Sequence, residues 1–129
     1  MKLAPLPFLL LALACGAEPT SVRDISQEEF LSAPPESVLV LDVRTEEEFR
    51  SGHVPGAVNI PHNELASRLQ DLGGGKGSPV VVYCEMGGRA GKAASVLAEA
   101  GYTDVLHLAG DMSDWRAQGR PVEVPNVAR

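Results

Sequence analysis

Short apolar runs alternate along the chain with segments whose apolar residues recur every three or four positions. Residues 37–43 (SVLVLDV) and 80–83 (VVVY) are almost continuously Val and Leu, a pattern typical of strands buried on both faces of a sheet. Shorter strands are predicted at residues 21–26, 57–60 and 104–108. Helices are predicted between the strands and after them, at residues 27–33, 46–52, 62–72, 89–100 and 113–119.

Capping signals mark the ends of several of these helices. Thr45 and Glu48 have the spacing of a capping box, and Gly101 is placed to end the Ala-rich helix at residues 89–100. Because strands alternate with helices, we expect parallel strand pairing with helices on both faces. The prediction is a three-layer α/β domain over residues 22–127, with a central, mostly parallel sheet of about five strands.

The first residues, MKLAPLPFLLLALAC, have the pattern of an export signal. Lys2 precedes an uncharged apolar stretch that is too short to span a bilayer. The final LALAC resembles a bacterial lipobox, in which Cys15 becomes the lipidated first residue of the mature chain. We therefore expect a signal peptide at residues 1–14, a tether at residues 15–21, and a periplasmic or cell-envelope protein lipid-anchored at Cys15. The alternative is simple export, with cleavage at the small-x-small sequence ALA and a soluble product.

The overall charge restricts the class of partner. The 129-residue chain carries 11 Lys and Arg against 17 Asp and Glu, a formal net charge of −6. No dense basic stripe offers a footprint for nucleic acid phosphates, so nucleic acid is not an expected partner. We expect the protein to associate with a membrane only through the predicted lipid anchor. Any anionic substrate must be attracted locally, against the field of the whole protein.

The sequence VVYCEMGGRAGKAA places Cys84 directly after a buried strand and shortly before a helix. In open parallel sheets, this edge is where ligands bind. The loop after the cysteine consists of Glu85, Met86, Gly87 and Gly88. Because its glycines accept conformations closed to other residues, the loop can turn successive backbone N–H groups inward. These groups, the helix N-terminus and Arg89 should stabilise a thiolate on Cys84, whereas the alternative is a buried, inert cysteine.

Two chemistries use a cysteine in such a cradle of amides. One is attack on phosphorus or arsenic in an oxyanion, and the other is sulfur transfer. The usual phosphatase loop is one residue longer than the four-residue spacing between Cys84 and Arg89. A smaller loop suits a single extra sulfur atom better than a tetrahedral phosphate. Spacing therefore favours sulfur transfer.

The segment CEMGGRA resembles the C-x-x-G-x-R-[SA] active-site loop of the rhodanese family. LDVRTEEEFRSGHVPGAVNIP (residues 41–61) resembles the first signature of that family, and GYTDVLHLAGDMSDWRAQGRPVE (residues 101–123) resembles its C-terminal one. The resemblance implies a single rhodanese domain in which Cys84 carries a persulfide and residues 85–89 bind the substrate. It implies no metal and no organic cofactor.

The same resemblance implies a sulfurtransferase that takes sulfur from thiosulfate and passes it to cyanide or a thiol. Glu85 departs from what such a donor favours, because a carboxylate beside the nucleophile repels a thiosulfate dianion. A neutral donor or a protein-bound persulfide partner is then expected instead. Asp111 is a second departure, because relatives commonly carry a second glycine at this position of the C-terminal signature.

Asp42 and Arg44 end the strand predicted at residues 37–43, so they lie at the same edge as the loop. Asp42 is a candidate partner that orients Arg89. The alternative is a structural ion-pair network that involves Glu47, Glu48 and Arg44. No metal site is expected, because no metal-ligand spacing occurs among His53, His62 and His107, which are interpreted as structural or surface residues.

Two other functions compete with sulfur transfer. A catalytically idle rhodanese-like module would bind a partner or report redox state, as the oxidising compartment and the acidic loop suggest. A small-oxyanion phosphatase or arsenate reductase would use the same nucleophile, but the shorter loop disfavours it.

Overall fold

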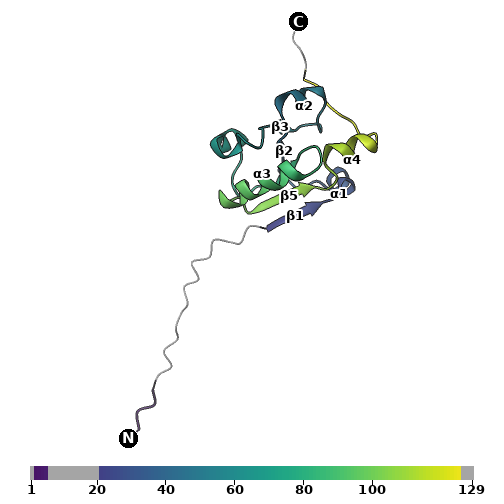
Figure 1. Ribbon diagram of the computed structural model, residues 1–129. Coiled ribbons are helices and arrows are strands. Elements are labelled where there is room, and N and C mark those ends of the chain that lie inside the picture. Colours follow the sequence, from purple (N-terminus) through teal and green to yellow (C-terminus); the bar gives the residue numbers. More distant parts are fainter. Residues whose placement is uncertain (1, 6–20, 126–129) are drawn as a thin grey trace.

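The computed structural model describes residues 2–5 and 21–125, and a single parallel sheet lies at its centre (Figure 1). The strands are β1 (Ser21–Ile25), β2 (Leu39–Asp42), β3 (Val58–Asn59), β4 (Val80–Tyr83) and β5 (Asp104–Leu108). They lie in the order β1-β5-β4-β2-β3, and every neighbouring pair is parallel. The predicted fold class is confirmed. Cys15 and most of the predicted signal peptide and tether lie outside the described residues.

Helices connect the strands and cover both faces of the sheet. They are α1 (Gln27–Ser32), α2 (Glu46–Ser51), α3 (Gly88–Glu99) and α4 (Asp111–Ala117). The predicted capping box is present, with Thr45 Oγ1 accepting from the Glu48 amide and Glu48 Oε1 accepting from the Thr45 amide, both at 3.2 Å. Gly101 follows α3 with φ +95°, as a helix-ending glycine does. Within the described residues, no helix combines the length and apolar character needed to cross a bilayer.

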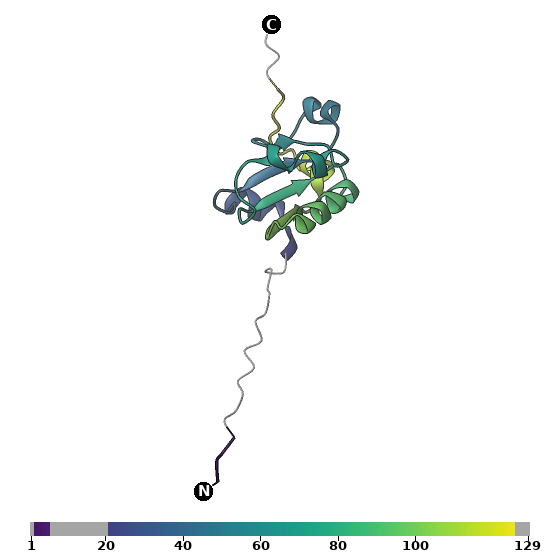
Figure 2. The same cartoon turned by 90° about the vertical axis from the view of Figure 1, so that its left-hand side faces the viewer.

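Side chains alternate along β4 and divide the core into two clusters. Val80, Val82 and Cys84 pack with the α3 side of the sheet, whereas Val81 and Tyr83 pack with α1 and α4. All four residues of β4 are buried, which explains why its sequence is apolar without interruption. Figure 2, turned by 90°, shows α3 in green along one side of the strands. This central position of β4 brings its carboxyl end, and therefore Cys84, to the middle of the sheet edge.

The prediction of a single helix at residues 62–72 is wrong. This segment forms two short 3₁₀ helices, η1 (Leu65–Ser67) and η2 (Leu69–Leu72), which are separated at Arg68. The Ser67 hydroxyl donates to the Glu64 carbonyl at 2.9 Å and so competes with continuation of the main-chain hydrogen bonds. Two short helices still bury Leu65 and Leu72, which satisfies the apolar pattern without one continuous helix.

Candidate active site

Cys84 lies at the carboxyl end of β4, and residues 84–87 connect this strand to the N-terminus of α3. The Gly87 amide donates a hydrogen bond to Cys84 Sγ at 2.9 Å. Gly87 reaches this position with φ +114°, which glycine adopts at little cost. Cys84 is only 1% exposed, whereas Met86 at the tip of the loop is 83% exposed. Cys84 is therefore shielded from solvent, and the loop directs at least one peptide dipole towards its sulfur.

The N-terminus of α4 holds the start of this loop. The Met112 amide donates to the Cys84 carbonyl, and the Ser113 amide donates to the Glu85 carbonyl, both at 3.0 Å. The first N–H groups of a helix have no partner within the helix, so the loop carbonyls satisfy two of those of α4. A helix that begins 27 residues after Cys84 thus sets the path of the cysteine loop.

Asp111, the first residue of α4, binds the nucleophile's own backbone. Its Oδ1 accepts from the Cys84 amide at 3.0 Å, and its Oδ2 lies 2.9 Å from Nε2 of His107. The residue is 2% exposed and has φ +54°, a left-handed conformation that Asp adopts more readily than most residues. Asp111, which stands where relatives commonly carry a second glycine, therefore lies directly beside Cys84.

Arg89 in the first turn of α3 is bound by Glu48 of α2. Its Nη1 donates to Glu48 Oε1 at 2.6 Å, and its Nη2 donates to Glu48 Oε2 at 3.0 Å. This bidentate hydrogen bonding lowers the pKa of Glu48 to about 2. The suggested pairing of Asp42 with Arg89 is wrong, because Glu48 takes that place.

Asp42 instead belongs to a buried network with Arg44 and Tyr83. Arg44 donates to Asp42 from Nε and Nη2 and to the Gly52 carbonyl from Nη2, while the Tyr83 hydroxyl donates to Asp42 Oδ2 at 2.6 Å. Burial, together with the negative charge of Asp42, raises the pKa of Tyr83. Asp42 is 0% and Arg44 1% exposed, so the geometry favours a structural role for both residues. The expected partners Glu47 and Glu48 are wrong, because Arg44 binds Asp42, the Gly52 carbonyl and Glu85 instead. The network joins Asp42 of β2 to Tyr83 of β4.

Glu85 is not a free carboxylate. Its Oε2 pairs with Arg116 of α4, and its Oε1 lies 3.4 Å from Nη1 of Arg44. Two guanidinium groups therefore offset the charge that the sequence placed beside the nucleophile. The repulsion expected for an incoming anion has to be revised downwards, because it assumed an unpaired Glu85.

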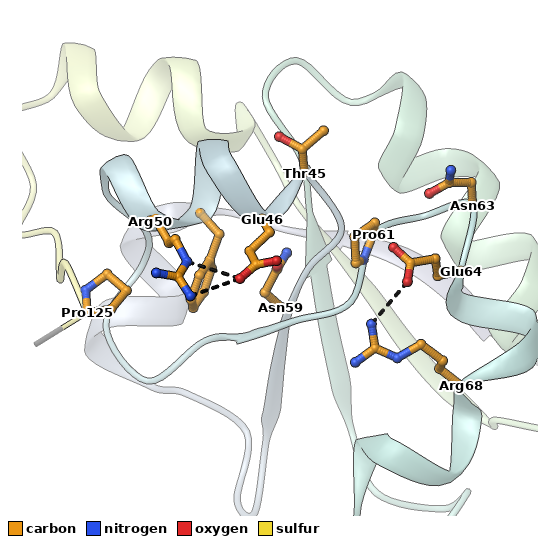
Figure 3. A pocket seen from close by; sticks show the side chains of 10 residues that line it. Thr45, Glu46, Arg50, Asn59, Pro61, Asn63, Glu64, Arg68 and Pro125 are labelled. Atoms are coloured by element: carbon orange, nitrogen blue, oxygen red, sulfur yellow. Dashed lines mark hydrogen bonds and ion pairs between the residues drawn. The ribbon is translucent and has the colours of Figure 1, made fainter. Parts of the chain in front are cut away.

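Two hollows flank these residues. One, of about 580 Å³, includes Arg44, Glu48, Glu85 and Arg116, and so adjoins the cysteine loop. The other, of about 630 Å³, lies between α2 and the segment after β3 (Figure 3). Its charged residues pair with one another, as Arg50 does with Glu46 and Arg68 with Glu64, and none of the cysteine loop lines it. We therefore place the candidate site at the cysteine loop.

The histidines differ in their surroundings. The His53 ring stacks on Phe49 at 3.7 Å between centroids, and its Nδ1 lies 2.9 Å from the Phe49 carbonyl, in keeping with a structural role. In residues 2–5 and 21–125, no group of three His, Cys, Asp or Glu side chains is arranged to hold a metal ion.

Sequence reasoning missed two residues of the site. His107 was interpreted as a structural or surface residue, yet it contacts Asp111 beside Cys84. Glu48 was assigned to the helix cap and to a network with Arg44, yet it binds Arg89. The only signal for the first was the unusual Asp111, which follows His107 by four residues. No local pattern reveals that Glu48 meets an arginine 41 residues away.

The comparisons with known proteins identify the family and agree with the fold. The model of the rhodanese-like domain matches residues 26–118. The chain is 34% identical over 106 residues to a protein named Sulfurtransferase from Allochromatium vinosum, covering 81% of this chain and 97% of that one. It is 40% identical over 70 residues to thiosulfate sulfurtransferase PspE of Escherichia coli, covering 54% and 67%. The crystal structure of a rhodanese-related protein from Thermoplasma volcanium matches with a TM-score of 0.70 and 26% identity, over 80% of this chain and 99% of the other. The chain belongs to the rhodanese-like domain family.

Proposed function

We propose that the protein is a sulfurtransferase that carries sulfur as a persulfide on Cys84. The Cys84 thiolate attacks the outer sulfur of thiosulfate, the sulfur–sulfur bond of the donor breaks, and its electron pair leaves with sulfite. Cyanide or a thiolate then attacks the outer sulfur of the Cys84 persulfide, which gives thiocyanate or a new persulfide and restores the thiolate. The observation that carries this proposal is the Gly87 amide directed at Cys84 Sγ where α3 begins.

The loop supplies stabilisation for negative sulfur in both half-reactions. The Gly87 N–H and the N-terminus of the 12-residue helix α3 favour an anion at this position. Arg89 adds positive charge, and Glu48 fixes its orientation. These groups are in place before the reaction, so they need no reorganisation as charge moves from one sulfur to the next.

The charges around Glu85 support an anionic donor. Arg44 and Arg116 offset its carboxylate, so thiosulfate meets less repulsion than an unpaired glutamate would cause. The relative PspE is named a thiosulfate sulfurtransferase. We therefore propose thiosulfate as a donor, alongside small or protein-bound persulfides.

The decisive experiment measures the mass of the protein by mass spectrometry. After incubation with thiosulfate, the purified chain should gain about 32 Da, the mass of one sulfur, and cyanide should remove this mass. The Cys84→Ser variant should gain nothing. No gain by the wild type from either thiosulfate or an organic persulfide would refute the proposal.

A rhodanese-like module without catalytic activity is the second candidate. The observation that favours it is the 1% exposure of Cys84, because a covered sulfur cannot be attacked unless the loop moves. In the sulfurtransferase proposal, the loop moves at its exposed tip, Met86, and at Gly87, because glycine accepts conformations closed to other residues. The mass experiment separates the two candidates, because only the enzyme acquires sulfur.

We also propose that the protein is exported and lipid-anchored at Cys15, a residue outside the described part of the chain. The support is the apolar N-terminal segment ending in LALAC. Labelling of expressing cells with palmitate should mark the wild type and not a Cys15→Ala variant. Equal labelling of both would contradict lipidation at this cysteine.

A further inference from the structure

His107 of β5 lies between two carboxylates from different elements. Its Nδ1 is 3.2 Å from Asp24 Oδ1 of β1, and its Nε2 is 3.0 and 2.9 Å from the two carboxylate oxygens of Asp111. Asp24 is exposed, whereas Asp111 is almost completely buried. The charged groups facing His107 are thus both negative, and one of them, Asp111, also accepts from the Cys84 amide.

Asp111 binds one end of the cysteine loop and leaves little space at the other. It accepts the hydrogen bond of the Cys84 amide, and its Oδ2 would lie 3.3 Å from a Cβ on Gly87, the residue whose amide binds the sulfur. Its left-handed backbone is unfavourable for a residue with a Cβ. The bonds of its side chain, and the bond from Gln27 to its carbonyl, compensate for this conformation.

A carboxylate at this place opposes the function of the loop. The loop is proposed to stabilise an anionic sulfur on Cys84. The nearby carboxylate of Asp111 makes that anion less favourable. A protonated His107 offsets the charge of Asp111. The hydrogen bond to Asp111 raises the pKa of His107, despite partial burial of the ring, and Asp24 contributes in the same direction. His107 therefore keeps its proton to a higher pH than an ordinary histidine.

We propose that His107 and Asp111 form a positioning pair that holds the cysteine loop and makes the reactivity of Cys84 depend on the protonation of His107. At lower pH the imidazolium offsets Asp111, and the loop accepts an anionic sulfur. At higher pH His107 is neutral, Asp111 is uncompensated, and that advantage is lost. The inference rests on the proposed function only in relating this reactivity to sulfur transfer.

The first test measures the rate at which iodoacetamide alkylates Cys84 at pH 6.5, with Cys15→Ser in every variant so that Cys84 is the only thiol. His107→Gln should react at least threefold more slowly than the parent, because Asp111 is left uncompensated. His107→Gln combined with Asp111→Asn should recover to within twofold of the parent, since Asn keeps the acceptor for the Cys84 amide without the charge. His62→Gln, which changes a histidine outside the pair, is the matched control and should react as the parent does.

Two results of this test would overturn the proposal. One is an unchanged rate in His107→Gln. The other is a double variant slower than the single one, which would mean that the pair only keeps the loop folded. Alkylation needs access to Cys84 but no sulfur donor. A protein that is alkylated yet gains no sulfur would therefore refute the sulfurtransferase proposal while this test still decides the role of the pair.

A second test uses the reciprocity of coupled charges and leaves the pair itself unaltered. If the protonation of His107 affects an anionic sulfur at Cys84, then removing that sulfur must affect His107 equally. NMR titration of the His107 ring should therefore give a lower pKa in Cys84→Ser than in the wild type. Identical titrations would show that the two groups do not interact, and would overturn the proposal.

Discussion

Gly87 is where the loop, the sulfur and the His107–Asp111 pair meet. It has φ +114°, its amide donates to Cys84 Sγ, and a Cβ added to it would lie 3.3 Å from Asp111 Oδ2 and 3.7 Å from His107 Cε1. Two independent factors, backbone conformation and space, therefore favour glycine. Neither factor applies to Gly91, one turn further along the chain in α3. Its φ is not positive, and a Cβ added there would have nothing within 4 Å.

These two glycines should respond in opposite ways to the same substitution. We expect Gly87→Ala to lower the free energy of unfolding by about 1–2 kcal/mol, because alanine is strained at positive φ, and to reduce sulfur loading of Cys84. Gly91→Ala should raise the free energy of unfolding by about 0.5–1 kcal/mol, because glycine is unfavourable inside a helix. Urea unfolding of both variants measures the change. A Gly87→Ala protein as stable and as active as the wild type would contradict the geometry of this loop.

Three elements meet at His107. It lies on β5, pairs with Asp24 of the neighbouring strand β1, and binds Asp111 at the start of α4. The same α4 N-terminus holds the carbonyls of Cys84 and Glu85. A change of charge at one histidine therefore acts on the packing of an edge strand and on the element that holds the loop.

The raised pKa of His107 makes stability depend on pH. A histidine whose pKa is higher in the folded than in the unfolded state contributes stability below about pH 6.5, and this is lost as the pH rises through the folded value. We expect the difference in free energy of unfolding between the wild type and His107→Gln to be largest near pH 6 and to shrink towards pH 9. Urea unfolding across this range measures the difference. A difference that does not vary with pH would mean that His107 acts by packing alone.

At the scale of the whole molecule, acidic residues outnumber basic ones, and the net charge is −6. Most of these carboxylates are in exposed positions, where an ion pair contributes little. Glu48 differs, because it joins α2 to Arg89 at the start of α3 and has a pKa lowered to about 2. Its stabilising contribution is present above its unfolded value, near pH 4.5, and is lost as the pH falls towards 2.

In the Glu48→Gln variant, the free energy of unfolding should therefore fall less steeply at acidic pH than in the wild type. We expect the variant to be less stable than the wild type at pH 7, and the two to converge between pH 4.5 and pH 2. Glutamine can still accept from Thr45 at this position of the capping box, so the helix cap is retained. Glu46→Gln, which alters an exposed pair with Arg50, is the control and should follow the wild type throughout. Urea unfolding of the three proteins at several pH values measures these differences. A difference between Glu48→Gln and the wild type that stays the same at every pH would contradict a role for the ion pair.

Much of this architecture could be predicted from local patterns. The runs VLVLD and VVVY predict buried strands because a strand covered on both faces needs apolar residues at every position. The Thr45 cap could be predicted because its partner lies three residues away. The 62–72 segment could not, because its leucine spacing fits both one helix and two short 3₁₀ turns that bury the same side chains.

The sequence by itself therefore determined the succession of strands and helices, and the place of Cys84 at the end of a strand before a glycine-bearing turn. These features depend on residues within a few positions of one another. Only the tertiary structure decided the partners of the loop, namely Glu48 for Arg89, Arg116 for Glu85, and Asp111 with His107 for Cys84. The physical reason is that β5 lies beside β4 and β2 lies on the other side, an arrangement that brings together polar and charged groups 27 to 41 residues apart.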